Sequence, residues 1–323
     1  MLNSKQPLII AASSSRRRFL TAAGVASAAL VGSSLVGYRP GLALGAQTAK
    51  FQSGKKKFAV NDNDILNFAL NLEYLEAEFY LRATTGTGLS STDTGGIVGD
   101  TTKKKDTGGA GTVTGGSQVP FATPLIQQIA QDIAADELAH VQFLRSALGA
   151  AAVAEPDINL TTAFTAAATA AGVISSGDSF DPFANEDNFL LAAFLFEDVG
   201  VTAYHGAAAY IHNSDYLAAA AGILGTEAYH AGGIRTLLLQ ASQTTAAIAT
   251  DANEIAAARA KLDGSNNDDE GITTSNGDAN LVDADSNALV FARTFQQVLD
   301  IVYLGGQSGN YGFFPNKLNG VIQ

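Results

Sequence analysis

Residues 137–140 read Glu-Leu-Ala-His, and residues 227–230 read Glu-Ala-Tyr-His. Residues three apart on a helix lie side by side on one face, so each segment can direct a carboxylate and an imidazole at the same ion. The chain has only ten glutamates and four histidines among 323 residues, so two such pairs are not expected by chance. The repeated motif therefore predicts two metal-binding segments, each on its own helix.

Apolar residues at helical spacing place both segments inside long helices. The pattern predicts four helices, over residues 62–83, 124–148, 186–211 and 214–241. Long connections follow the first and the second helix, whereas a tight turn at His212-Asn213 joins the last two. Two helical hairpins joined by a long middle crossover form one of the known layouts of a four-helix bundle.

The other two helices each carry a glutamate within an apolar run. Glu73 lies in the run Phe-Ala-Leu-Asn-Leu-Glu-Tyr-Leu of residues 68–75, and Glu197 closes the run Leu-Leu-Ala-Ala-Phe-Leu-Phe-Glu of residues 190–197. A carboxylate on an apolar face is costly unless a positive charge lies opposite it. The order along the chain is Glu, Glu-x-x-His, Glu, Glu-x-x-His, which predicts that six side chains from four helices converge.

The charge of these six side chains suits a pair of metal ions. Four carboxylates and two neutral imidazoles balance two divalent cations. Oxygen and imidazole ligands are accepted by iron, manganese and zinc, so the ligand types alone do not choose the metal. We therefore expect two divalent metal ions as cofactors, iron or manganese in the first place, with zinc as a further candidate.

Two segments resemble those of known metal-binding bundles. Residues 71–81 (Asn-Leu-Glu-Tyr-Leu-Glu-Ala-Glu-Phe-Tyr-Leu) resemble the first helix of ferritins, and residues 136–140 (Asp-Glu-Leu-Ala-His) resemble the second-helix ligand motif of bacterioferritins. The likeness covers about residues 60–243 and is to the ferritin-like proteins grouped with plant desiccation-related proteins, which residues 312–316 (Gly-Phe-Phe-Pro-Asn) also resemble. It implies an all-α fold, a ferritin-like antiparallel four-helix bundle with a long middle crossover.

The resemblance also implies roles for the six residues. The implied metal ligands are Glu73, Glu137, His140, Glu197, Glu227 and His230. Glu137 and Glu227 would bridge the two ions and serve as the catalytic residues, with the other four ligands terminal. Two ions so placed can hold dioxygen or peroxide between them, so metal ions and oxygen or peroxide are the expected partners.

The sequence leaves the function open between two hypotheses. The first is a redox enzyme of stress defence that resembles either a ferroxidase, oxidising Fe(II) with oxygen, or a manganese catalase, dismutating peroxide. The second is a non-enzymatic protein that protects against stress or desiccation and whose metal is structural or sequestered. A further alternative is that these acids and histidines form ordinary ion pairs in a bundle that binds no metal.

Several residues near the predicted ligands have two interpretations. Glu76 is either an additional ligand or an acid at the edge of the surface. Tyr80 and Tyr204 each lie seven residues after a predicted ligand and can hydrogen-bond ligand carboxylates, although packing is the commoner role of a buried tyrosine. Asp136 and Asp198 are either carboxylates that orient a ligand histidine or exposed helix acids.

The N-terminal residues resemble a twin-arginine export signal. Ser15-Arg-Arg-Arg-Phe-Leu20 is followed by a weakly apolar stretch, residues 19–36, that is rich in Ala, Gly and Ser. We expect residues 1–45 to direct export of a bacterial protein to the periplasm or another extracytoplasmic compartment. The alternative is an uncleaved membrane anchor, and only then would the protein associate with a membrane.

Two further regions lie outside the predicted helices of the bundle. Residues 84–122 form a Gly/Thr-rich insertion, and residues 244–323 form a C-terminal extension in which apolar spacing predicts one additional helix, over 287–304, packed on the bundle. The insertion, the extra helix and the export signal together argue against a 24-subunit storage cage. The sequence leaves open whether the protein forms a homodimer.

The composition excludes several other classes of protein. The absence of cysteine excludes disulfide scaffolds, Cys-ligated metal sites and thiol catalysis. The net charge of −12 argues against a nucleic-acid partner, because phosphates are neutralised by a basic surface. With 46% hydrophobic residues the chain can bury a core that offsets its conformational entropy, so disorder of the whole chain is not expected.

Overall fold

The structure, a computed structural model, describes residues 60–101, 106–264, 269–306 and 311–323. The predicted export signal, residues 1–45, lies outside these residues. Within them the fold is all-α with a few very short strands, which confirms the predicted fold class. None of the described helices is both long enough and apolar enough to cross a membrane.

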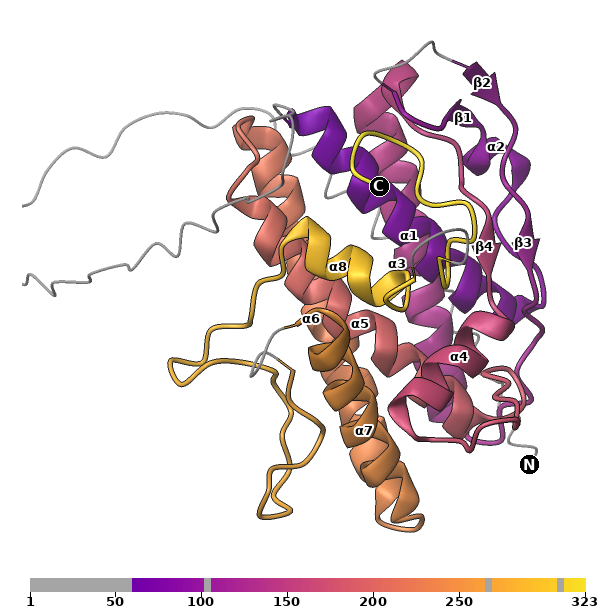
Figure 1. Cartoon of the computed structure of the whole chain (residues 1–323), viewed down its shortest axis with the longest axis vertical. Helices are drawn as coiled ribbons and strands as arrows, with labels where there is room; N and C mark the ends of the chain where they lie inside the picture. The colour runs from indigo at the N-terminus through magenta and orange to yellow at the C-terminus, as the bar shows by residue number, and fades with distance from the viewer. Residues whose placement is uncertain (1–59, 102–105, 265–268, 307–310) are drawn as a thin grey trace, which may run out of the picture. The chain divides into compact units, whose positions relative to one another are not determined.

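Four long helices form the bundle (Figure 1). They are α1 (Asp62–Thr85), α3 (Pro124–Leu148), α5 (Glu186–Ala208) and α6 (Ser214–Ser242). α1 packs chiefly on α3, and α5 packs chiefly on α6, so the bundle consists of two hairpins. The crossover between them contains the 3-10 turn η2 (Gly149–Ala151) and the helix α4 (Thr162–Ala171). The predicted order of hairpin, long crossover and hairpin is therefore confirmed.

Polar side chains at the helix ends fix where the bundle helices start and stop. Asn61 and Asp64 exchange side-chain-to-backbone hydrogen bonds of 3.2 and 3.0 Å, a capping box that starts α1. The Asp62 carboxylate accepts the backbone N–H groups of His212 and Asn213 at 3.0 and 2.8 Å. This contact holds the turn between α5 and α6 against the start of α1. The helix α5 ends at Ala208, whereas the sequence predicts that it continues to residue 211.

Aromatic side chains join the crossover and the C-terminal residues to the core of the bundle. Phe79 of α1 stacks on Phe189 of α5 with ring centroids 5.4 Å apart. Phe164 of α4 lies edge-on to Phe313 at 4.9 Å, and Phe196 of α5 contacts both of these rings. All five side chains are buried. The segment around Phe313 is therefore part of the same core as the four helices.

The Gly/Thr-rich insertion folds against the crossover. It contains the short helix α2 (Ser91–Thr94) and the strands β1 (Gly96–Val98), β2 (Asp106–Gly108) and β3 (Val113–Thr114). β1 pairs antiparallel with β2, and β3 pairs parallel with β4 (Ile158–Asn159) of the crossover. The first residue of β1 lies so close to the crossover that a Cβ there would be 2.5 Å from a carbonyl oxygen, so this position requires glycine.

The described part of the C-terminal extension contains two helices, so the prediction of a single helix is wrong. They are α7 (Ala247–Leu262) and α8 (Phe295–Val302). The buried positions of α7 hold isoleucine, alanine and arginine, namely Ile248, Ala252, Ile255, Ala256 and Arg259. The sequence does not indicate α7 because this face lacks a stripe of large apolar residues.

The last helix is also shorter than predicted. The Asp285 carboxylate accepts the backbone N–H of Leu289 at 3.0 Å, and Ala288 has a φ of 59°. A residue in the left-handed region does not continue a right-handed helix. α8 begins only after this turn, where Thr294 and Gln297 form a capping box.

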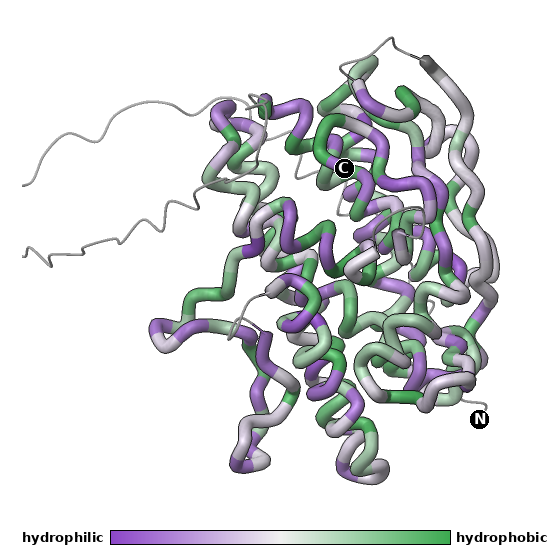
Figure 2. Tube along the Cα trace, viewed as in Figure 1, coloured by the Kyte–Doolittle hydropathy of each residue, from purple (hydrophilic) through white to green (hydrophobic). Residues whose placement is uncertain are grey.

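Three buried arginines attach the extension to the bundle. They lie on α6, on α7 and just before α8, and they are Arg235, Arg259 and Arg293. Their carboxylate partners are Asp198 of α5 and three aspartates after α7, namely Asp263, Asp269 and Asp283. The connection between α7 and α8 carries the hydrophilic stretches seen in Figure 2, and several of its acids are thus paired inside the protein.

Candidate metal centre

The structure brings together all six residues that the sequence predicts as metal ligands. They form two groups in which one ligand atom from each residue lies within 4.8 Å of the others. The first group is Glu73, Glu137, His140 and Glu227, and the second is Glu137, Glu197, Glu227 and His230. Glu137 and Glu227 belong to both groups, which is the arrangement expected of two ions that share two carboxylates.

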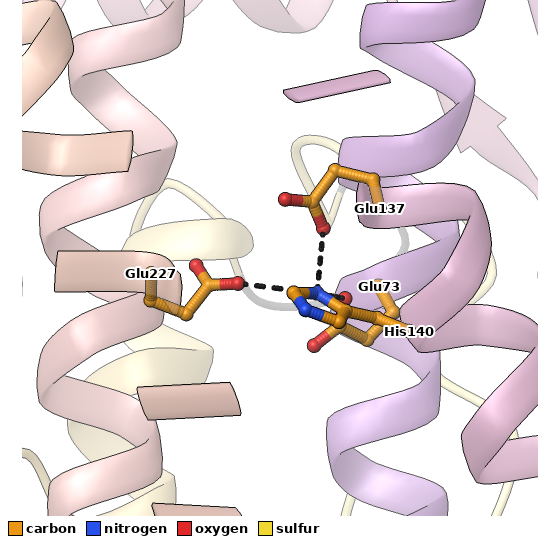
Figure 3. Close-up of side chains that lie close together, drawn as sticks. All are labelled: Glu73, Glu137, His140 and Glu227. Carbon is orange, nitrogen blue, oxygen red and sulfur yellow. Dashed lines mark hydrogen bonds and ion pairs between the residues drawn. The ribbon is translucent and has the colours of Figure 1, made fainter. Parts of the chain in front are cut away.

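Each long helix of the bundle supplies part of the site. Glu73 comes from α1 and Glu197 from α5, whereas α3 and α6 each supply a glutamate and a histidine three residues apart. Figure 3 shows the first group, in which Glu227 points from one side toward Glu137 and His140 on the other. The four carboxylates have no exposed surface, and His140 and His230 are 8% and 6% exposed.

The first group surrounds the Nδ1 atom of His140. This nitrogen lies 3.1 Å from Glu73 Oε2, 3.3 Å from Glu137 Oε2 and 3.5 Å from Glu227 Oε1. Three carboxylate oxygens from three helices thus converge on one imidazole nitrogen. An ion held here would have one nitrogen and three carboxylate ligands.

The second group surrounds the Nδ1 atom of His230. This nitrogen lies 3.0 Å from Glu137 Oε1 and 3.5 Å from Glu197 Oε2. Several buried atoms here have no hydrogen-bond partner in the part of the chain that the structure describes: His230 Nδ1, Glu137 Oε1, Glu197 Oε2 and both carboxylate oxygens of Glu227. Buried polar atoms are rarely left unpaired, so these inward-facing oxygens and nitrogens fit a pair of divalent cations.

The acids and histidines of the site shift one another's protonation. Burial raises the pKa of Glu73 to about 7 and raises that of Glu227 well above its ordinary value. Burial also acts to raise the pKa of Glu137, but the nearby imidazoles of His140 and His230 lower it to about 2. Burial acts to lower the pKa of His140, but the charges of Glu73 and Glu137 raise it to about 11. Without metal, protons therefore hold the cluster together, and metal binding must displace them.

Two tyrosines connect the hairpins through the predicted terminal ligands. Tyr80 of α1 donates its hydroxyl hydrogen to Glu197 of α5, and Tyr204 of α5 donates to Glu73 of α1. Both rings are buried, and burial raises the pKa of each hydroxyl well above its ordinary value. The two tyrosines therefore stay protonated as donors, and packing alone does not describe their role.

The two aspartates with open roles have different partners. Asp136 Oδ2 lies 3.4 Å from His230 Nε2, on the side of the ring away from the other ligands, where a carboxylate can orient the imidazole. Asp198 instead binds Arg235 and Arg259 at 2.9 and 2.7 Å and contacts neither ligand histidine.

Two acids of α1 near the centre are buried. Glu76 is 5% exposed, so it is not an acid at the edge of the surface. Burial and the charges of nearby carboxylates raise its pKa well above the ordinary value. Glu78 is also buried, but it binds Arg82 at 2.5 Å and accepts the backbone N–H of Leu89 at 2.7 Å. Glu76 thus faces the site, and Glu78 belongs to a separate ion pair.

A groove between α3 and α6 leads to the second ligand group. It encloses about 740 Å³, and its lining includes His230, Asp136, Gln128, Ile133 and Tyr229. Asp136 keeps a side-chain exposure of 34%, whereas the His230 side chain is 6% exposed. Small molecules in this groove would meet Asp136 and the outer edge of His230 before the buried carboxylates.

Two known proteins are similar to most of the chain. The chain is 29% identical over 263 residues to "Desiccation-related protein PCC13-62" of Craterostigma plantagineum, which covers 78% of this chain and 80% of that protein. It is 26% identical over 282 residues to "Ferritin-like catalase Nec2" of Nesocodon mauritianus, which covers 81% of this chain and 84% of that protein. No solved structure shows a significant match to the chain.

The sequence profile described as "Ferritin-like domain" matches residues 61–240. This match spans more than half of the chain and contains all four helices of the bundle up to residue 240, with the six converging side chains. The fold, the buried carboxylate and histidine cluster and the profile therefore lead to one conclusion, that the chain belongs to the ferritin-like domain family.

Proposed function

We propose that this protein decomposes hydrogen peroxide at a dinuclear manganese or iron centre. The observation that carries the proposal is the pair of ligand groups that share Glu137 and Glu227. A pair of redox-active ions supplies the two electron equivalents needed to turn two molecules of hydrogen peroxide into two of water and one of oxygen. The name of the relative "Ferritin-like catalase Nec2" supports the same reaction.

Each of the six site residues would have a definite role in this reaction. Glu137 and Glu227 would bridge the two ions and be the catalytic residues, because each belongs to both ligand groups. Glu73 and Glu197 would be terminal ligands, held by tyrosine hydroxyls from the opposite hairpin. His140 and His230 would be the nitrogen ligands. The four carboxylates are fully buried, so the ions would be held away from bulk water.

Oxygen evolution from the metal-loaded protein tests the proposal. The purified chain is loaded with Mn(II) or Fe(II), the bound metal is counted, and oxygen release from hydrogen peroxide is followed with an electrode. Two ions per chain and steady oxygen release are expected, and Glu137→Gln is expected to abolish the release. If the protein oxidises Fe(II) with oxygen but does not consume peroxide, its activity is ferroxidase-like and not catalase-like.

A second function is supported by the other relative. The match to "Desiccation-related protein PCC13-62" favours a protective protein whose metal pair is structural or sequestered. Such a protein would bind two ions but turn over neither peroxide nor Fe(II). Stoichiometric metal with no turnover in both assays would therefore favour this function over the enzyme.

We also propose that residues 1–45 export the protein by the twin-arginine route. The support is the sequence Ser15-Arg-Arg-Arg-Phe-Leu20 and the weakly apolar stretch after it. A reporter fused after residue 59 should reach the periplasm of a bacterium that has this route. Replacing Arg16, Arg17 and Arg18 with lysine should keep the reporter in the cytoplasm, and unchanged export of that variant would refute the route.

A further inference from the structure

The internal repeat of the bundle breaks at one pair of positions beside the metal centre. Glu73 on α1 corresponds to Glu197 on α5, and each is followed seven residues later by a tyrosine. Three residues after these glutamates, however, α1 has Glu76 and α5 has Gly200. The two positions are close in space, since a Cβ added at Gly200 would lie 3.5 Å from Glu76 Oε1.

Gly200 leaves space that the carboxylates of the centre occupy. A Cβ at this position would lie 2.2 Å from Glu227 Oε2 and 3.2 Å from the Glu227 carboxyl carbon. Any larger residue would therefore displace a carboxylate that both ligand groups share. Glycine inside a helix is less favourable than alanine, and the room it leaves for Glu227 and Glu76 is a physical reason to keep it.

Within residues 60–101, 106–264, 269–306 and 311–323, the carboxylate of Glu76 has no hydrogen-bond or ion-pair partner. Its side chain is 5% exposed. The charged groups that act on it most are Glu137, Glu197, Glu73 and His140, all of them predicted ligands. A small cavity lies beside Glu76. Apart from Gly200, its other lining residues are apolar, and they include Leu72, Leu195, Phe196 and Phe313. A buried carboxylate in such surroundings is stabilised by a nearby positive charge, and the two metal ions of the proposed function would supply that charge.

We propose that Glu76 is a fifth carboxylate of the metal centre and that Gly200 provides the space it shares with Glu227. The inference rests on the metal pair of the proposed function and adds one residue to its ligand set. Five carboxylates exceed the charge of two divalent ions by one negative unit. The centre as a whole therefore matches one divalent and one trivalent ion, and Glu76 favours the more oxidised state of the pair.

Metal titration of the full chain tests this role without any turnover. Wild type, Glu76→Gln and Gly200→Ala are titrated with Co(II), and heat of binding and visible absorption are recorded. Wild type should bind two ions, and each variant should bind at least one of them about tenfold more weakly or worse, with an altered Co(II) spectrum, as expected when a group that supports a metal site is lost. Reduction of the Mn-loaded protein should shift to a more positive potential in Glu76→Gln.

Two matched variants control for the substitutions themselves. Glu78→Gln removes a buried carboxylate of α1 that pairs with Arg82, and Gly225→Ala adds a Cβ on α6 where nothing lies within 4 Å. Both should keep the Co(II) affinity and spectrum of wild type.

Thermal unfolding separates loss of a ligand from loss of the fold. Glu76→Gln should raise the melting temperature of the metal-free protein, because the buried amide is neutral without having to take up a proton, and should reduce the rise that metal produces. Wild-type Co(II) affinity and spectrum in both Glu76→Gln and Gly200→Ala would overturn the inference and leave the proposed function intact. Two bound ions without peroxide turnover in wild type would reject the proposed function and leave Glu76 as a ligand, whereas no bound ion in wild type would reject both.

Discussion

The Tyr204 hydroxyl of α5 donates a hydrogen bond to the Glu73 carboxylate of α1, 131 residues earlier in the chain. Tyr80 and Glu197 make the same contact in the opposite direction between these two helices. Each bond joins a predicted terminal ligand of one hairpin to a donor on the other. The assembly of the two hairpins and the shape of the candidate metal centre are therefore coupled.

Replacing Tyr204 with phenylalanine should weaken this coupling. The substitution keeps the ring but leaves a buried carboxylate oxygen without its donor, which costs about 1–3 kcal/mol. We expect the free energy of unfolding of the metal-loaded protein to fall by that amount in urea titrations. Tyr229→Phe is the control, because this side chain is 84% exposed. Equal losses in the two variants would contradict a role for the Tyr204 hydroxyl.

The carboxylate behind His230 should set the affinity of the second ligand group. Asp136 Oδ2 lies 3.4 Å from His230 Nε2, whereas the corresponding residue before Glu227 is Thr226, which bonds a carbonyl of its own helix at 3.4 Å. Loss of a carboxylate that orients a ligand histidine typically lowers metal affinity 10–100-fold. Asp136→Asn should therefore weaken the binding of one of the two Co(II) ions by about that factor.

The control for this experiment is Asp132→Asn, one turn earlier on α3 and in the same groove. It should leave both Co(II) affinities unchanged. If the two variants weaken metal binding equally, the effect comes from the charge of the groove and not from the contact with His230.

Raising the pH should lower the stability of the metal-free fold but increase the affinity for metal. In the metal-free fold the pKa of Glu73 is raised to about 7 by burial, and that of His140 to about 11 by the charges of Glu73 and Glu137. Groups with a raised pKa stabilise the fold at low pH and lose that contribution as pH rises through the raised value. The pKa of Glu137 is lowered to about 2, so its contribution to stability is fully present above the ordinary pKa of a glutamate and is lost only as the pH falls toward 2.

Metal binding displaces these protons, so metal affinity should rise with pH. The difference in melting temperature between protein with Mn(II) and protein with a chelator should therefore grow from pH 5.5 to pH 9. Calorimetry at matched ionic strength measures both states. A difference that stays constant over this range would mean that the cluster exchanges no protons with the metal.

The six converging side chains could be predicted because the information is local. A spacing of three residues fixes which side chains share a helix face, and Glu73 and Glu197 stand out as acids in apolar runs. Gly200 could also have been found from the sequence, by aligning the two hairpins on these glutamates. Its meaning, however, depends on the distance to Glu227 across the bundle.

The partners of other buried charges could not be predicted from the sequence. Asp198 lies next to a ligand, but its partner Arg259 is 61 residues away on a helix that apolar spacing does not indicate. The same arginine explains why α7 has no clear stripe of apolar residues, since a charged residue occupies one of its buried positions. Contacts of this kind depend on how helices pack and not on a local pattern.

The contact between Arg259 and Asp198 should hold the C-terminal extension to the bundle. The Arg259 guanidinium is fully buried, binds Asp198 at 2.7 Å and Asp269 at 2.9 Å, and lies 4.6 Å from the centre of the Phe194 ring. Removing one partner of a buried ion pair leaves an uncompensated charge and costs about 3–5 kcal/mol. Arg259→Ala should lower the free energy of unfolding by this amount in urea, while Lys261→Ala on the same helix, where the residue is exposed, should change it little. A loss below about 1 kcal/mol in Arg259→Ala would show that the extension does not depend on this ion pair.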